Sequence, residues 1–243
     1  MAAPKAPEIS VVVPVYNEEG AAPALAREIA AAFKGRSFEI VFVDDASKDG
    51  TRKALVGLKN EIPELKVFAH TKNSGQSRAV RSGVLKARGE IIVTLDGDGQ
   101  NDPADGPKLV DILKAGSPEL ALVGGERTKR QDSAAKKIAS RWANGIRKSL
   151  LKDNANDTGC GLKVFRREAF LRLPYFDHIH RYLPALMIRE GFTCAFAPVN
   201  HRARETGVSK YTNLGRLWAA FSDLTGVMWL NRRSRLPGAV DEV

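Results

Sequence analysis

Two carboxylates and an amide lie within the five residues Asp96-Gly97-Asp98-Gly99-Gln100, which directly follow the apolar run at 91–95. Carboxylate oxygens are ligands that Mg²⁺ and Mn²⁺ prefer, and these ions usually keep positions open for phosphate and water. A cation held there can stabilise the charge that develops on a departing diphosphate, and the two glycines let the backbone approach that group closely. The stretch therefore predicts a divalent metal beside a diphosphate, although such a triplet standing alone could also be a polar turn that caps a helix.

Two further polar clusters follow apolar runs in the same way. Tyr16-Asn17-Glu18 comes after the run at 9–15, and Asp44-Asp45 ends the run at 38–43. Short runs rich in β-branched residues are typical of strands that are buried on both faces. Ligands of open α/β sheets bind beyond the carboxyl ends of the strands. Three polar clusters at three strand ends therefore indicate one ligand site rather than three unrelated turns.

The elements that must position these clusters alternate between strands and helices along the first half of the chain. We expect five strands, at residues 9–15, 38–43, 65–69, 91–95 and 120–124. Helices are expected between them, with ends near residues 33, 59, 89 and 115. Each connection is long enough for a crossover, so the pattern predicts an α/β fold whose mostly parallel, doubly wound sheet is flanked by helices.

The second half of the chain departs from this alternation. We expect a basic amphipathic helix at 133–151, a loop with an edge strand at 158–165, a helix at 178–190 and a strand at 192–199. His178 and His180 are two residues apart, so on a helix they do not share a face. We therefore expect no metal to be held between these two histidines.

The last segment combines an apolar stripe with a basic end. A helix is expected at about 213–230, and arginines follow it at positions 232, 233 and 235. Its stripe consists of Leu214, Leu217, Trp218, Phe221, Leu224 and Met228. This stripe could lie at a membrane interface, pack on the rest of the chain or bind a partner protein. We expect one domain over residues 1–212, followed by an amphipathic helix and basic tail over residues 213–243.

The glycine pattern argues against two common classes of nucleotide-binding protein. The chain has no GxxxxGK[ST] loop, and the strand at 9–15 is followed by Tyr16-Asn17-Glu18 rather than by GxGxxG. Both of those loops cradle phosphates with backbone N–H groups at the start of a helix. A P-loop NTPase and a dinucleotide-binding dehydrogenase are therefore not expected.

The charge balance limits the possible partners without choosing among them. The 243 residues carry a formal net charge of +10. Nucleic acid, an anionic membrane surface or a phosphate-rich substrate would each suit this charge. No recognised nucleic-acid-binding motif is present, so we expect no nucleic acid as a partner, and a basic nucleic-acid-binding module stays a distant alternative. Cys160 and Cys194 form no CxxC pair, which favours reduced thiols and no zinc site.

Four blocks of sequence, in order along the chain, resemble the family 2 glycosyltransferases with the GT-A fold. They are VVVPVYNEE (11–19), IVFVDDASKDGT (40–51), NSGQSRAVRSG (73–83) and GEIIVTLDGDGQNDP (89–103). Three later pieces are similar to the branch of that family that makes polyprenyl-phosphate sugars, to which dolichol-phosphate mannose synthase belongs. These pieces are GGER (124–127), DTGCGLKVFRR (157–167) and RETGVSKY (204–211). The resemblance implies inverting, metal-dependent transfer of a sugar from a GDP- or UDP-linked donor to a polyprenyl phosphate.

The resemblance also implies roles for individual residues. The nucleotide pocket would be lined by Pro14, Tyr16, Asn17 and Glu18, with Asp44 and Asp45 on the base and ribose and Asp96 near the ribose and diphosphate. Asp98 and Gln100 would hold the metal, Mg²⁺ or Mn²⁺. The phosphates of donor and acceptor would be bound by Arg127, Arg204, Ser209 and Lys210. The catalytic candidates are Asp98, Arg127, Asp157, Arg204 and Lys210.

The chemistry of the acceptor favours a phosphate over a sugar hydroxyl. A hydroxyl acceptor needs a base, whereas a phosphate is already an anion and needs positioning and neutralisation. Arg127, Arg204 and Lys210 can supply these by fork and point-charge recognition. Asp157 could orient the acceptor, act as a weak base or cap a turn. Transfer to a hydroxyl of a glycan or glycolipid remains the alternative, and it would require such a base carboxylate.

The expected location follows from the acceptor and from the hydropathy of the chain. Residues 1–7 carry no apolar signal region, and no stretch has the roughly 20 nearly uncharged residues that a spanning helix needs. We therefore expect a cytoplasmic protein without a transmembrane segment, peripheral at the inner face of the membrane. It would meet the lipid there through the membrane surface or through a membrane-embedded partner protein.

Overall fold

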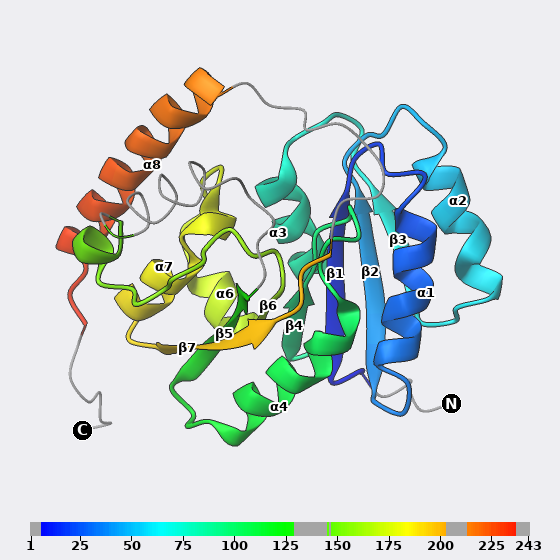
Figure 1. Cartoon of the computed structure of the whole chain (residues 1–243), viewed down its shortest axis with the longest axis horizontal. Helices are drawn as coiled ribbons and strands as arrows, with labels where there is room; N and C mark the ends of the chain where they lie inside the picture. The colour runs from blue at the N-terminus through cyan, green and yellow to red at the C-terminus, as the bar shows by residue number, and fades with distance from the viewer. Residues whose placement is uncertain (1–5, 129–144, 146, 203–212, 237–243) are drawn as a thin grey trace, which may run out of the picture.

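A computed structural model of the chain describes residues 6–128, 145, 147–202 and 213–236, with residues 213–220 described by their backbone only. A seven-stranded sheet with the order β3-β2-β1-β4-β6-β5-β7 runs through the molecule (Figure 1). Helices cover both of its faces. The expected α/β fold, a mostly parallel sheet flanked by helices, is confirmed.

The strands pair mainly in parallel. They are β1 (Ile9–Val15), β2 (Phe38–Asp44), β3 (Leu65–Ala69), β4 (Ile91–Thr94), β5 (Leu120–Arg127), β6 (Lys163–Arg166) and β7 (Thr193–Val199). β1 pairs in parallel with β2 and β4, β2 with β3, and β5 with β7. β6 is antiparallel to both β4 and β5. Every residue of β1 is buried, as expected for a strand that is covered on both faces.

The helices form two layers, each with its own apolar core. They are α1 (Ala22–Ala32), α2 (Thr51–Gly57), α3 (Gln76–Lys86), α4 (Gly106–Ala115), α6 (Arg167–Arg172), α7 (Leu183–Arg189) and α8 (Asn213–Arg233), with short 3-10 helices at Leu58–Asn60, Pro103–Asp105 and Ile179–Arg181. One core contains Ile29 of α1 and Leu109 of α4, and the other contains Val80 of α3 and Leu186 of α7. Alternate residues of the central strands enter opposite cores, because strand side chains point to the two faces in turn.

One strand lies in a different place from the one expected. The segment 158–165 was expected to contain an edge strand, but β6 lies between β4 and β5 in the interior of the sheet. Val164 and Phe165 are fully buried there. An apolar run of this length indicates burial, but it does not identify the strand beside it, so the sequence could not distinguish an edge from the centre.

The single helix expected at 178–190 is broken into a 3-10 helix and α7. His178 adopts a left-handed backbone conformation with φ of 62°, and Tyr182 separates the two short helices with φ of −114°. Pro184 occupies the first turn of α7, where the missing N–H of proline leaves no helical hydrogen bond unmade. The break turns residues 180 and 181 toward the cavity described below.

Smaller differences concern the ends of elements. The helix expected to end at residue 89 ends at Lys86, and the strand expected at 120–124 continues to Arg127, which places that arginine at the end of β5. Of the amphipathic helix expected at 133–151, residues 145 and 147–151 are described and are helical. The remainder of that helix lies outside the described residues.

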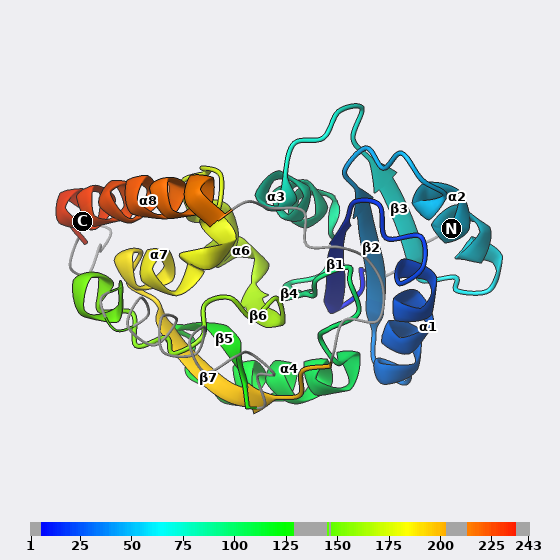
Figure 2. The same ribbon diagram turned by 45° about the horizontal axis from the view of Figure 1, so that its top comes forward.

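The C-terminal helix α8 lies beside α7 at one end of the molecule (Figure 2). Val227 is buried in the interface, and Leu224 and Met228 pack against the same core. Phe221 and Trp229 are 61% and 59% exposed. Part of the predicted apolar stripe therefore packs on the chain itself and part of it faces outward. Among the described residues, no helix is long and apolar enough to cross a membrane.

Candidate active site

The sheet brings the three polar clusters of the sequence to one edge. β1 lies between β2 and β4 and is parallel to both, so the carboxyl ends of these three strands are neighbours. Val15 of β1 is directly opposite Asp44 of β2, and residues 95–96 continue from β4 on the other side. The expectation that the clusters meet at one edge is confirmed.

The cluster after β1 is bound to the loop after β2. The backbone N–H of Asn17 donates to Ser47 Oγ at 2.9 Å, and the Asn17 side-chain oxygen accepts from the N–H of Lys48 at 2.7 Å. The N–H of Glu18 donates to Thr51 Oγ1 at 2.9 Å. Asn17 has a φ of 52°, a left-handed conformation that asparagine tolerates better than most residues. The two loops therefore form a single rigid rim beside the cavity.

Both aspartates at the carboxyl end of β2 hold loops of this rim. The Asp44 carboxylate is fully buried, accepts from the N–H of Ser47 at 3.0 Å and pairs with Arg52 Nε at 2.7 Å. This arrangement ties the helix α2 to the end of β2. The contact of Asp44 with a base or ribose stays a prediction, because no nucleotide is present to test it.

Asp45 anchors the loop before α3. Its carboxylate accepts from the backbone N–H groups of Ser74 at 2.9 Å and Gly75 at 2.8 Å, and its Oδ1 lies 2.6 Å from His70 Nδ1. The second ring nitrogen of His70 lies 2.9 Å from Ser82 Oγ in α3. Asp45 thus fixes the position from which α3 begins.

Asp96 and Asp98 lie on the turn after β4. Gln76 Nε2, at the start of α3, donates to Asp96 Oδ1 at 2.7 Å, and Asp98 Oδ1 accepts from the N–H of Gln100 at 3.2 Å. Burial and the negative charge of Asp98 raise the pKa of Asp96 to about 6. The two carboxylates are therefore close enough to repel one another, and a divalent cation would relieve that repulsion.

These residues fit a metal that is shared with substrate oxygens. Within the described part of the chain, no three His, Cys, Asp or Glu side chains converge as a complete metal cage. Mg²⁺ and Mn²⁺ sites at diphosphates need only one or two carboxylates, because phosphate and water complete the coordination. The carboxylate pair on the turn matches that pattern.

Glycines allow this turn to pack tightly. A Cβ on Gly97 would lie 2.6 Å from Val15 Cγ1 and 2.7 Å from the Pro14 carbonyl oxygen, and a Cβ on Gly161 would lie 2.2 Å from Asp96 Oδ2. Neither position accepts a side chain without movement of its neighbours. The Asp96 carboxylate is therefore held between Gln76 on one side and the backbone of Gly161 on the other.

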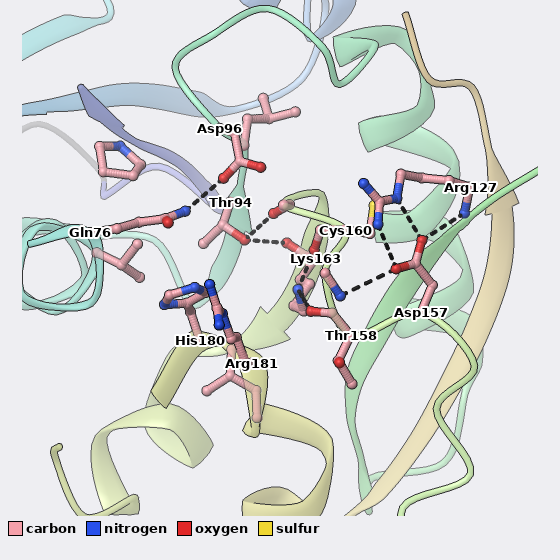
Figure 3. Close-up of a pocket in the computed structure, with 16 residues that line it drawn as sticks. Gln76, Thr94, Asp96, Arg127, Asp157, Thr158, Cys160, Lys163, His180 and Arg181 are labelled. Carbon is pink, nitrogen blue, oxygen red and sulfur yellow. Dashed lines mark hydrogen bonds and ion pairs between the residues drawn. The ribbon is translucent and has the colours of Figure 1, made fainter. Parts of the chain in front are cut away.

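A cavity of about 330 Å³ opens beside Asp96 (Figure 3). Its walls come from β1, α3, β4, β5, β6, the turn at 157–161, the 3-10 helix before α7 and the start of α7 itself. The charged residues in these walls are Asp96, Arg127, Asp157, Lys163 and Arg181. A cavity lined by three cations and two carboxylates is suited to an anionic ligand.

Arg127 and Asp157, two of the catalytic candidates, form a bidentate pair. Arg127 Nε lies 2.6 Å from Asp157 Oδ2, and Nη2 lies 2.8 Å from Oδ1. Burial opposes the charged guanidinium, but the hydrogen bonds to Asp157 raise the pKa of Arg127. Asp157 also accepts from the N–H of Gly159 at 3.2 Å, so it caps a turn as well. Its role toward an acceptor stays a prediction.

Lys163 is a residue of the site that sequence reasoning missed. Its side chain is in the interior of the sheet and 5% exposed. Its ammonium group donates to the carbonyls of Thr158, at 3.2 Å, and Cys160. Burial lowers the pKa of Lys163. The available signal was a lysine at the start of an apolar strand, because lysines are seldom buried without a partner.

The turn at 158–161 is also bound to β4. Thr94 Oγ1 donates to the carbonyl of Gly161 at 2.9 Å. With the contacts of Lys163, this bond fixes the turn that carries Gly161 against Asp96 and Asp157 against Arg127. Lys163 and Thr94 therefore act on the site by holding its walls in place.

His180 and Arg181 also line the cavity, and neither was expected from the sequence to take part in the reaction. His180 Nδ1 shares a hydrogen bond of 2.7 Å with Ser77 Oγ of α3. Burial, followed by the charges of Lys163 and Arg181, lowers the pKa of His180 to about 3, so this imidazole is neutral at physiological pH. The only signal in the sequence was the pair of adjacent basic residues before Tyr182.

His178 has a different environment from His180. Its Nδ1 lies 2.8 Å from Asp223 Oδ2 on α8, so this histidine helps to attach the C-terminal helix. The two histidine rings therefore contact different elements, and neither is a member of a group that could hold a metal within the described residues.

Three predicted phosphate-binding residues, Arg204, Ser209 and Lys210, lie outside the described residues. The chain leading to them is attached to the metal turn, since the N–H of Arg202 donates to the Gln100 carbonyl at 2.9 Å. The side chain of Arg202 pairs with Glu28 at 2.6 Å and Asp102 at 2.9 Å. The described part of this segment therefore ends beside Gln100.

Comparisons with known proteins agree on one family. The model of Glycosyl transferase family 2 matches residues 10–173. A dodecaprenyl-phosphate galacturonate synthase of Rhizobium johnstonii is 34% identical over 239 residues, which are 95% of this chain and 69% of that protein. An undecaprenyl-phosphate 4-deoxy-4-formamido-L-arabinose transferase of Yersinia enterocolitica is 34% identical over 212 residues, 86% of this chain and 64% of that protein. The chain thus spans about two thirds of the length of these relatives.

Solved structures agree on the fold. Glucosyl-3-phosphoglycerate synthase from Mycobacterium tuberculosis, crystallised with UDP, has a TM-score of 0.69 and 19% identity over 93% of this chain and 80% of that chain. The same enzyme crystallised with Mn²⁺, UDP-glucose and glycerol 3-phosphate has a TM-score of 0.70, with the same identity and coverage. The family match covers more than half of the chain and the structural likeness supplies the GT-A fold, so this chain belongs to glycosyl transferase family 2 and is a glycosyltransferase.

Proposed function

We propose that this glycosyltransferase moves a sugar from a nucleoside-diphosphate sugar to the phosphate of a polyprenyl lipid, with inversion at the sugar. The observation that carries the proposal is the cavity lined by Asp96, which has three cations in its walls. Asp98 follows Asp96 by two residues on the same turn. The names of both relatives, a dodecaprenyl-phosphate and an undecaprenyl-phosphate transferase, support the same acceptor class.

Asp98 and Gln100 would hold a divalent cation, Mg²⁺ or Mn²⁺, and Asp96 would lie beside the ribose and diphosphate. When bound, such a cation neutralises the charge of a leaving diphosphate. The protein's own part is to keep the Asp96 carboxylate fixed, through the bond from Gln76 Nε2 at 2.7 Å and the contact with Gly161. The crystallisation of the structural neighbour with Mn²⁺ is compatible with this proposal.

The nucleotide, GDP or UDP, would occupy the rim formed by the loops after β1 and β2. Pro14 lines the cavity, and Tyr16, Asn17 and Glu18 follow it on the rim. Asp44 and Asp45 are buried beneath this rim and would serve base and ribose binding by holding its loops in place. A rigid rim suits this role, because little conformational entropy is then lost when the nucleotide binds.

The state of Asp157 favours a phosphate acceptor over a hydroxyl acceptor. A hydroxyl acceptor needs a free carboxylate as base, but both oxygens of Asp157 are engaged by Arg127. A phosphate acceptor instead needs an oriented cation, and Asp157 orients the guanidinium group of Arg127. Arg204, Ser209 and Lys210 would complete the phosphate site from the segment that begins beside Gln100.

The outer face of α8 would bring the enzyme to a membrane surface. Phe221, Trp229 and Leu236 are each about 60% exposed, and arginines follow at positions 232, 233 and 235. Exposed aromatic side chains beside clustered arginines suit the interface of an anionic leaflet. This face would hold the protein at the cytoplasmic side of the membrane, where a polyprenyl phosphate presents its head group. On this proposal, residues 213–243 serve as the membrane-facing appendage of the domain over residues 1–212.

The test is a screen of UDP- and GDP-linked sugars against a polyprenyl phosphate, the matching polyprenol and a glycan acceptor, with Mn²⁺ or Mg²⁺ and detection of products by mass. We expect transfer to the phosphate only. Asp98→Asn should reduce turnover at least about 100-fold, because one donor of charge stabilisation in a site of this kind contributes about that much. Asp111→Asn, an exposed carboxylate on α4 paired with Arg36, is the matched control and should retain turnover. Unchanged turnover of Asp98→Asn would refute the metal role, and transfer to polyprenol or glycan would favour the hydroxyl alternative.

A further inference from the structure

Among the described residues, one cation of the cavity has neither a carboxylate nor a backbone carbonyl as its partner. Arg127 is paired with Asp157, and Lys163 donates to backbone carbonyls. Arg181 also lines the cavity, yet among the described residues no carboxylate lies within ion-pair distance of its guanidinium. A partly buried charge without a partner is costly unless a ligand of opposite charge occupies the space beside it.

The backbone that carries Arg181 is firmly placed. Arg181 is the last residue of the 3-10 helix, whose first residue, Ile179, is buried, and Tyr182 directly after it is buried as well. The N–H of Arg181 donates to the carbonyl of His178 at 3.0 Å. Buried residues on both sides therefore present the arginine to the cavity, as they would for a binding group.

Arg181 lies across the cavity from the Arg127–Asp157 pair. Figure 3 shows His180 and Arg181 on one wall and Arg127 with Asp157 on the other, with Asp96 near the β4 end. Asp157 engages Nε and Nη2 of Arg127, and Nη1 has no acceptor among the described residues. Two guanidinium groups thus border the same space from two sides.

The position of Arg181 in the sheet indicates which ligand it would contact. The rim proposed for the nucleotide belongs to β1 and β2, and the carboxylates at 96 and 98 repel any phosphate that does not share a cation with them. Arg181 follows α6 and β6, in the half of the sheet beyond β4. An anion beside Arg181 is therefore the one that enters from the side opposite the nucleotide.

We propose that Arg181 binds the phosphate of the acceptor, a phosphate monoester at the end of an isoprenoid chain. Guanidinium groups bind phosphate through two parallel N–H···O bonds, which fix its orientation as well as its place. Arg181 and Nη1 of Arg127 together hold the phosphate against the cavity floor. This inference rests on the proposed function, because it assigns a residue to the acceptor of that reaction.

The test measures binding of a short prenyl phosphate, citronellyl phosphate, to the full chain by calorimetry, with inorganic phosphate, citronellol and UDP plus Mn²⁺ as separate ligands. Arg181→Met should weaken the affinity for citronellyl phosphate at least about tenfold, because the loss of one charged hydrogen-bonding group costs about that much. The affinity for UDP should stay within about twofold of that of the unchanged chain. Arg181→Lys should recover part of the loss. Arg172→Met, an exposed arginine on α6 paired with Glu168, should bind all ligands as the unchanged chain does.

Three outcomes would overturn the assignment. If Arg181→Met binds citronellyl phosphate as tightly as the unchanged chain does, the acceptor binds elsewhere. If the affinity for UDP falls by the same factor, Arg181 binds the nucleotide-sugar donor instead. Thermal unfolding of each variant verifies that it is folded. Inorganic phosphate that binds as tightly as citronellyl phosphate, with the same loss in Arg181→Met, identifies a free-phosphate site and also overturns the lipid assignment. If the unchanged chain binds citronellyl phosphate but transfers no sugar to polyprenyl phosphate, the proposed function fails while the Arg181 assignment stands.

Discussion

Gly161→Ala tests whether the turn at 158–161 positions Asp96. A Cβ at residue 161 would lie 2.2 Å from Asp96 Oδ2 and 2.3 Å from its Cγ. Ordinary contact begins at 3.4 Å, so the carboxylate must move by about 1.2 Å or the turn must give way. The turn is bound by Lys163 and by Thr94 Oγ1, so we expect Asp96 to move and its bond from Gln76 to break.

The substitution is expected to reduce both stability and catalysis. Overpacking of this kind costs about 1–3 kcal/mol of unfolding free energy. A misplacement of about 1 Å near the reacting groups can cost about 100-fold in rate, or about 2.7 kcal/mol in the transition state. We therefore expect kcat/KM for the donor found in the screen to fall about 100-fold, with the fold retained.

Gly159→Ala is the matched control in the same turn. Its Cβ would approach Arg127 Nη2 at 3.1 Å and Asp157 Oδ1 at 3.5 Å, contacts that side chains can relieve by a few tenths of an ångström. Product formation measured by mass, with urea unfolding for both variants, separates the two effects. If Gly161→Ala keeps kcat/KM within about threefold of the unchanged chain, the fixed position of Asp96 is not needed and the reasoning fails.

The remaining predictions concern the cavity wall, pH and the outer face of α8. Lys163→Met should lower the unfolding free energy by about 1–3 kcal/mol, because two buried carbonyls lose their hydrogen-bond donor. Urea unfolding that matches that of the unchanged chain would contradict this. The pKa of His180 is about 3 in the folded chain and 6.5 in the unfolded chain. As the pH falls from 6.5 towards 3, the imidazole therefore takes up a proton in the unfolded chain but not in the folded chain, and the free energy of unfolding decreases. From pH 7 to pH 5 the unchanged chain should lose about 1–2 kcal/mol more than His180→Gln in urea unfolding, and equal losses would count against the neutral imidazole. Trp229→Ser should reduce binding to vesicles rich in anionic lipid several-fold in a co-sedimentation assay. Stability should be unchanged, because the side chain is 59% exposed. Unchanged vesicle binding would argue against this face as the membrane-binding surface.

Sequence alone was sufficient for the site edge and for most of the parallel sheet. The run at 9–15 and those at 38–43 and 91–95 form β1, β2 and β4, with the polar clusters at their carboxyl ends. These features are local, because β-branched runs indicate buried strands and the polar residues follow them directly in the chain. The resemblance to family 2 glycosyltransferases rested on the same local blocks, and the family match confirms it.

Only the tertiary structure decided what surrounds that edge. It placed β6 between β4 and β5, joined Arg127 to Asp157 thirty residues away, and brought Lys163 and Arg181 into the cavity wall. No local pattern identifies these spatial neighbours, because they depend on which strands become adjacent and on where a helix breaks. The carboxylates could be found from their spacing along the chain, whereas the cations that face them come from distant segments that meet only when the sheet is assembled.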